Sequence, residues 1–231
     1  MHENYNTHAH IGQRLIDIGF IKEGLSVKYC GEPMKLRGRW VRRLCHNRLC
    51  PTCGPLSIKK QKQKIPSKMG TVLLTTTVSN CPWRELSAVL QEMQKAWRRL
   101  LRRLSSGGGN WLKVLHISKG KDNLAHPHFH ILMDKCKLRD SQELCELWQK
   151  ARNSDKAEVC DLRRNVDTVR TIHYLARSLW IDLDDSELYA FVCAIQNVRT
   201  VDSSRPLSRR RDQDDKKSKY SMTIRQHASM R

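Results

Sequence analysis

Hydrophobic residues recur along the chain at the spacings expected of several helices and strands. The clearest helix is predicted over residues 83–104, where one apolar stripe lies opposite a face of lysines and arginines. A β-branched run predicts a strand over residues 70–78. The same reasoning predicts helices at residues 11–18, 140–152, 166–180 and 184–197, and strands at residues 111–118, 126–133 and 157–163.

The order of these elements between residues 70 and 163 predicts the fold class. Strand, helix, strand, strand, helix and strand follow one another, which is the ferredoxin-like order. We therefore expect an α+β protein with one antiparallel sheet and helices packed on one face. The cysteine-bearing segment before it lacks clear periodicity and is expected to form a small module of its own. The predicted parts are an N-terminal helix or arm (1–27), a basic module (28–66), the main domain (67–204) and a basic, largely disordered tail (205–231).

Charge narrows the possible partners. The chain has 231 residues, with 43 Lys and Arg against 23 Asp and Glu, a formal net charge of +20. Such an excess predicts a polyanionic partner, for which nucleic acid is the default and an anionic membrane surface or a solubility device the alternative. No apolar run approaches the roughly 20 residues that span a bilayer, and the first residues lack a signal-peptide pattern. We therefore expect a cytoplasmic protein without a membrane partner.

Four cysteines crowd into the basic module. Cys45, Cys50 and Cys53 lie within nine residues, and Cys30 is the natural fourth partner. A close pair of cysteines on a turn, completed by more distant ones, is typical of a structural Zn²⁺ site. Because the segment has little else to fold around, we expect one bound zinc. Reduced thiols or a redox pair are the alternative, and His46 is a substitute ligand.

Basic side chains surround these cysteines. A zinc-stapled basic loop suits contact with DNA phosphates, although a run of charges is more often a solvated face. The residues expected to contact DNA are Arg42, Arg43, Arg48, Lys59 and Lys60.

Histidines mark a second candidate metal site. His128 and His130 alternate with Phe129 on a predicted strand, so both imidazoles share one face while Phe129 points into the core. His116 lies on the preceding strand and can face them across an antiparallel pair. Imidazole is a common ligand of divalent metals. The alternative is three polar residues on a wet or half-buried face.

Four motifs together resemble a known superfamily. In order they are Cys30-Gly31, the run from Cys45 to Cys53, His126-Pro127-His128-Phe129-His130-Ile131-Leu132, and Ile172-His173-Tyr174-Leu175-Ala176-Arg177. This pattern resembles the HUH endonucleases, and within them the rolling-circle replication initiators (Rep proteins) of small plasmids. The resemblance implies that the main domain is an HUH nuclease. Such a nuclease binds Mn²⁺ or Mg²⁺ and nicks single-stranded DNA at a plasmid origin.

The resemblance also implies residue roles. His128 and His130 would be metal ligands, with His116 where the family often has glutamate, and an all-histidine site favours Mn²⁺ over Mg²⁺. Tyr174 would attack the phosphate, leaving a 5′-phosphotyrosine and a 3′-hydroxyl primer. Arg177 would steady the phosphate where the family usually has lysine. A host helicase and polymerase would then act as partners.

One departure from the family pattern concerns termination. Many of these initiators have a glutamate four residues before the tyrosine, where this chain has Arg170. Asp167 is a weak substitute.

Two other functions stay open: an HUH transposase, which usually has two catalytic tyrosines, and a non-catalytic zinc-bearing DNA-binding regulator. Tyr189, in another predicted helix, counts against a paired-tyrosine motif.

Overall fold

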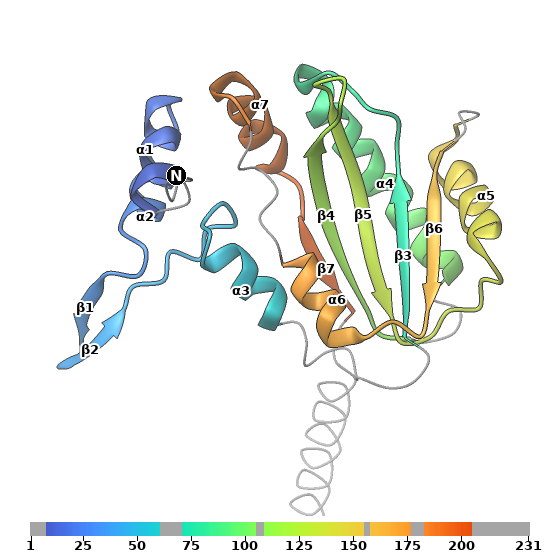
Figure 1. The fold of residues 1–231 in the computed structure, drawn as a ribbon, viewed down its shortest axis with the longest axis horizontal. Helices are drawn as coiled ribbons and strands as arrows, with labels where there is room; N and C mark the ends of the chain where they lie inside the picture. The colour runs from blue at the N-terminus through green and yellow to red at the C-terminus, as the bar shows by residue number, and fades with distance from the viewer. Residues whose placement is uncertain (1–7, 61–70, 105–108, 155–157, 177–182, 205–231) are drawn as a thin grey trace, which may run out of the picture.

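A five-stranded antiparallel sheet forms the centre of the protein (Figure 1). The structure, a computed structural model, describes residues 8–60, 71–104, 109–154, 158–176 and 183–204. The strands lie in the order β6-β3-β5-β4-β7, so the first four have the predicted ferredoxin-like arrangement and β7 extends one edge. Their bounds are β3 (Val72–Thr77), β4 (Trp111–Lys119), β5 (Ala125–Met133), β6 (Cys160–Arg164) and β7 (Val201–Ser203).

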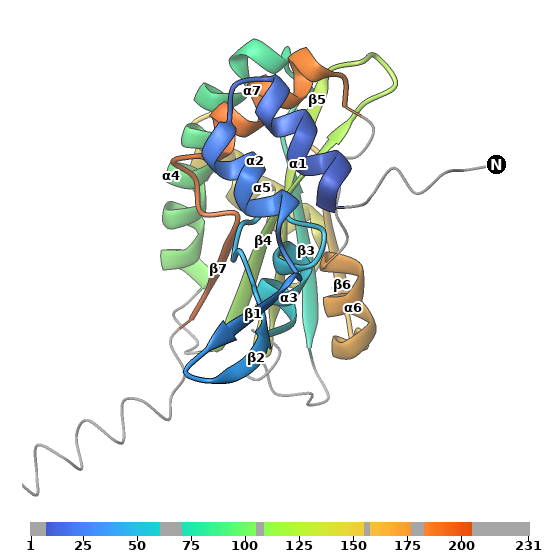
Figure 2. The ribbon, with the colours of Figure 1, turned by 90° about the vertical axis from the view of Figure 1, so that its left-hand side faces the viewer.

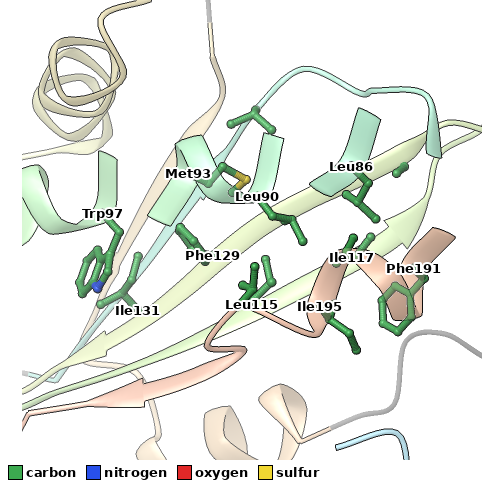
Figure 3. Packing of buried hydrophobic residues seen from close by; sticks show 14 of the residues in the cluster. Leu86, Leu90, Met93, Trp97, Leu115, Ile117, Phe129, Ile131, Phe191 and Ile195 are labelled. Carbon is green, nitrogen blue, oxygen red and sulfur yellow. The ribbon is translucent and has the colours of Figure 1, made fainter. Parts of the chain in front are cut away.

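One face of the sheet packs against three helices. These are α4 (Leu86–Leu104), α5 (Ser141–Arg152) and α7 (Asp185–Ile195), with the short helix η2 (Trp83–Glu85) before α4. Phe129 and Ile131 of β5 point into this core, as the alternation along the strand predicts. Figure 3 shows them beside Trp97 of α4 and, further along the sheet, Ile195 of α7 near the residues of β4. The predicted α+β class with helices on this face is confirmed.

Two shorter helices cover part of the opposite face of the sheet. The sequence had predicted helices on one face only. The two shorter helices are α3 (Cys53–Lys59) and α6 (Thr168–Leu175). Their apolar side chains form a second buried cluster with the sheet: Ile58, Leu73, Leu112, Val114, Leu132, Ile172, Leu175 and Ala176. α6 ends at Leu175, earlier than the predicted 180, and the residues from 177 to 182 lie outside the described part of the chain.

The N-terminal part packs onto the core that the sheet forms with α4, α5 and α7. α1 (His8–Asp17) and α2 (Ile21–Lys28) form a helical hairpin, and a two-stranded ribbon of β1 (Pro33–Leu36) and β2 (Arg39–Arg42) extends from it (Figures 1 and 2). The two helices approach closely at Gly24, where an added Cβ would lie 2.6 Å from a backbone oxygen of α1.

Sequence patterns had indicated only α1 among these elements. Among the described residues, no helix is both long and apolar enough to cross a membrane. The predicted disordered tail lies outside the described residues.

Candidate active site and cysteine cluster

Three histidines meet on the face of the sheet that carries α3 and α6. His116 of β4 pairs directly with His128 of β5, and His130 follows two residues along β5 on the same face. One nitrogen from each imidazole lies within 4.8 Å of the others. His128 and His130 therefore share a face, as the alternation along the strand predicted, and the antiparallel register adds His116.

Backbone carbonyls orient two of these rings. The Nε2 of His116 donates to the carbonyl of Leu175 at 3.0 Å, which leaves its Nδ1 as an acceptor. The Nδ1 of His128 donates to the carbonyl of His126 at 3.2 Å, which leaves its Nε2 as an acceptor. Such bonds to the second ring nitrogen are the usual support of a metal-binding histidine.

The third ring carries an unpaired atom. The Nδ1 of His130 lies 3.1 Å from the hydroxyl of Thr75 on the neighbouring strand β3. Its Nε2 is buried and has no hydrogen-bond partner among the described residues. A buried polar atom without a partner is costly, and a bound cation would satisfy it. Thr75 was missed because nothing local in the sequence links it to His130.

Burial also keeps the three imidazoles neutral. Loss of solvent lowers the pKa of His116, and it lowers the pKa of His128 to about 4 and of His130 to about 3, with the neighbouring His116 adding to both shifts. A metal binds the neutral imidazole, so protons do not compete for these nitrogens near pH 7. The donor set therefore fits a divalent cation that keeps further positions open for water or a substrate oxygen.

Tyr174 lies beside this site. Its ring centroid is 5.5 Å from that of His130 and 6.2 Å from that of His116, and 45% of the residue is exposed. Leu175, the next residue, accepts the hydrogen bond from His116. This bond ties the end of α6 to the histidines, and the tyrosine with it. Arg177, expected to hold the phosphate, lies outside the described residues.

Asp167, which the sequence suggested as a weak substitute for the terminating glutamate, lies at the start of α6. Asp167 caps the helix, accepting from the backbone N–H groups of Val169 at 2.8 Å and Arg170 at 3.0 Å. Arg170 is exposed and its side chain lies 3.6 Å from the same carboxylate. Asp167 thus has a structural use as a helix cap.

The four cysteines also come together. Their sulfur atoms lie within 4.8 Å of one another, and the sulfurs of Cys30 and Cys53 are 3.6 Å apart. A tetrahedral zinc with Zn–S bonds of about 2.3 Å places sulfurs ~3.8 Å apart. Backbone N–H groups point at two sulfurs, Asn47 at that of Cys45 and Cys53 at that of Cys50. The cluster can therefore hold one zinc, and exposed His46 is outside it.

The predicted DNA contacts divide into two groups. Arg42, Arg43, Lys59 and Lys60 are exposed on the surface around the cysteine cluster. Arg48 instead donates to the backbone carbonyls of Ile195 at 2.8 Å and Val198 at 2.6 Å. Arg48 is exposed as a residue as well, but desolvation of its guanidinium lowers the pKa. These two hydrogen bonds connect the segment that carries the cysteines to the end of α7. No local sequence pattern predicted this role for Arg48.

Residues 35–228 match the family described as Replication protein. This chain belongs to that replication protein family. It is 29% identical over 160 residues to Protein rep of a Bacillus species, which covers 62% of this chain and 52% of the relative. It is 27% identical over 161 residues to Protein rep of Bacillus amyloliquefaciens, covering 62% and 47%. Similarity to Protein rep of Streptococcus pneumoniae is 28% over 131 residues, covering 46% and 40%.

The chain spans about half the length of the curated relatives it matches. No solved structure matches it.

Proposed function

We propose that this protein is an HUH-type replication initiator that nicks one strand of a plasmid origin and remains linked to its 5′ phosphate. The observation that carries the proposal is that the ring of Tyr174 lies beside three largely buried histidines, each of which offers one nitrogen within 4.8 Å of the others. Membership of the replication protein family supplies the biological setting. The net charge of +20 supports a DNA partner.

The reaction is a transesterification. His116, His128 and His130 would hold a divalent cation, Mn²⁺ or Mg²⁺, which supplies Lewis acidity toward a phosphate oxygen. The hydroxyl oxygen of Tyr174 forms a bond to phosphorus as the bond to the 3′ oxygen breaks. The phenol proton passes to solvent, and the departing 3′ oxygen takes up a proton to become the hydroxyl primer. We infer that Arg177 steadies a non-bridging oxygen.

The chain's own residues contribute position and preorganisation. The bond from His116 to Leu175 fixes the end of α6, so the ring of Tyr174 is held beside the histidines that would bind the metal. With 45% of the residue exposed, Tyr174 can be approached by a DNA strand from solvent. The proposal also includes a structural zinc bound by Cys30, Cys45, Cys50 and Cys53. It further includes a host helicase and polymerase as partners and a cytoplasmic location.

The two alternatives have less support. A paired-tyrosine transposase needs a second tyrosine beside the metal, but Tyr189 is on α7, which packs on the opposite face of the sheet. Its ring lies 5.5 Å from that of Phe20. A non-catalytic regulator would have no use for the unpaired Nε2 of His130 or for an exposed tyrosine next to it.

A Tyr174→Phe variant tests the nucleophile. It keeps the ring and its packing but removes the hydroxyl, so DNA binding and stability should stay near wild type while the covalent adduct disappears. The measurement is incubation with labelled single-stranded origin DNA and Mn²⁺, followed by denaturation and mapping of the modified peptide. Tyr189→Phe is the matched control and should keep the adduct. An adduct mapped to any residue other than Tyr174 contradicts the assignment.

A further inference from the structure

The β1–β2 hairpin, residues 33–42, is exposed along its whole length. Every residue of both strands is on the surface. Trp40 is 72% exposed, which is unusual for so large an aromatic side chain. In Figures 1 and 2 the hairpin extends away from the sheet at the edge of the molecule. A tryptophan held in solvent on a projecting ribbon indicates a contact surface.

The pairing of the two strands decides what surrounds the indole. Lys35 lies directly opposite Trp40, and Pro33 lies opposite Arg42. Directly paired residues share a face, and residues two apart on a strand share it too. One face of the hairpin therefore places Trp40 next to two cations, Lys35 directly opposite it and Arg42 two residues along its own strand. Met34, Leu36, Arg39 and Val41 occupy the other face.

Both ends of the hairpin are fixed. At the base, the N–H of Gly31 donates to the carbonyl of Arg43 at 2.7 Å, and the N–H of Arg43 donates to the carbonyl of Glu32 at 2.9 Å. At the tip, Arg37 and Gly38 both adopt positive φ, 47° and 79°, as a tight two-residue turn requires. Two cysteines of the cluster, Cys30 and Cys45, bracket the hairpin in sequence.

The charge of this segment selects the chemistry of the partner. Residues 33–84 contain no Asp or Glu, and five cations lie on or next to the hairpin: Lys35, Arg37, Arg39, Arg42 and Arg43. A flat aromatic ring between cations is the arrangement that binds an unpaired base and its flanking phosphates. A base inside a duplex is already stacked on its neighbours and does not offer its face.

We propose that the β1–β2 hairpin is a binding site for single-stranded DNA, in which an unpaired base stacks on Trp40 while Lys35 and Arg42 contact phosphates. The inference rests on the proposed function, in that the substrate is a DNA strand opened at the nick site. α3 begins at Cys53 of the same cluster and packs on α6, so the hairpin and the tyrosine helix belong to one connected unit. The strand bound at the hairpin would be the one that continues from the tyrosine site.

Equilibrium binding of the full, zinc-loaded chain tests the proposal. All variants carry Tyr174→Phe and no Mn²⁺ or Mg²⁺ is added, so the chemical step is absent. The probe is a fluorescein-labelled single-stranded oligonucleotide of mixed sequence, with the same sequence as a duplex for comparison. Trp40→Ala should raise the Kd for the single strand about tenfold and leave the duplex Kd within twofold. Trp40→Phe should restore most of the affinity.

Leu36→Ala is the matched control, since it removes a large exposed side chain from the opposite face of the same hairpin. It should bind both probes like the parent protein, and zinc content should be equal in all variants. An unchanged single-strand Kd in Trp40→Ala overturns the proposal. Equal weakening for single strand and duplex also overturns it, and indicates a ribbon in a duplex groove. Adduct formation at Tyr174 is measured in a separate experiment. If that experiment contradicts the nicking proposal, the two Kd values still decide whether the hairpin binds single-stranded DNA.

Discussion

At the scale of single residues, the histidine site combines neutral imidazoles with ring orientations fixed by hydrogen bonds. Burial lowers the pKa of His128 to about 4, and the carbonyl of His126 accepts a hydrogen bond from its Nδ1. Each of the three imidazoles has one nitrogen hydrogen-bonded to the protein and a second nitrogen that could bind a metal. The proposed catalysis depends on that second nitrogen.

A His128→Ala variant measures this dependence. Removing one of three ligands should lower Mn²⁺-dependent nicking of single-stranded origin DNA by at least ~100-fold. DNA affinity should change little, because phosphate contacts by lysine and arginine dominate it. Nicking is followed on gels and affinity by anisotropy. His10→Ala, which removes an exposed imidazole from α1, should behave as wild type. Cleavage by wild-type protein that is insensitive to added metal would mean that the histidines are structural.

Sequence reasoning brought these histidines together because strand geometry is local. The alternation of His128, Phe129 and His130 is sufficient to place two imidazoles on one face. Thr75 and the carbonyl of Leu175 hold the rings in place, yet they come from elements 55 and 59 residues away in sequence. Contacts of that kind depend on the register of the sheet and on the docking of α6, which no short pattern encodes.

At the scale of elements, β4 carries a charge into the core. Lys113 is fully buried between the sheet and α4, where its Nζ donates to Gln94 at 2.8 Å and lies 4.6 Å from the ring centroid of Phe129. Burial lowers its pKa to about 8. In the unfolded chain the lysine pKa is near ~10.4. Between these values the folded state binds fewer protons than the unfolded state.

The contribution of Lys113 to the free energy of unfolding should therefore rise as pH increases from about 8 to 10, while buried thiols with raised pKa, such as Cys81 and Cys160, contribute in the opposite direction. Lys113→Met removes the buried charge, so it should abolish this rise and stabilise the protein at pH 7 by about 1–2 kcal/mol. Urea unfolding at pH 7 and pH 9.5 measures both effects. Lys95→Met, at an exposed position of α4, should leave the pH dependence in place. The assignment fails if the free energy of unfolding changes by the same amount between pH 7 and pH 9.5 in Lys113→Met and in wild type.

The elements that sequence patterns missed share a physical cause. Periodicity reports which side chains are buried, and the β1–β2 hairpin buries none of its strand residues. α2 is only eight residues long and contains Gly24, and β7 has three residues. By contrast, α4 buries a full apolar stripe and the central strands bury a full face. These elements were predicted, and in the correct order.

At the scale of the whole molecule, the cysteine cluster joins parts that are distant in sequence. Cys30 follows α2, Cys45 follows the hairpin, and Cys53 begins α3. Cys30, Cys50 and Cys53 belong to the main hydrophobic core, together with residues of α1 and the sheet. Arg48, in the middle of the cluster, binds the end of α7. A metal at this point would hold the N-terminal third of the chain against the sheet.

Zinc content tests this organisation. Elemental analysis should find about one tightly bound zinc per chain, which Cys50→Ser should lose together with much of its resistance to unfolding. Burial raises the pKa of the Cys45 thiol to about 11. Because zinc binds the thiolate, apparent affinity should fall as pH is lowered. Cys193→Ser, on α7, should keep its zinc. Undiminished zinc in Cys50→Ser would reject the assignment.

All three histidines belong to two strands that are neighbours in sequence, β4 and β5, joined by one short loop. Contacts between nearby residues form with a small entropic cost of loop closure, so this ribbon can pair early when the chain folds. Tyr174 lies later in the chain, on α6, and reaches the histidines only when that helix docks on the sheet. During synthesis the three histidines are therefore made before Tyr174. Under the proposed mechanism, a nascent chain can pair the strands that would hold the ion before it has the residue that would attack DNA.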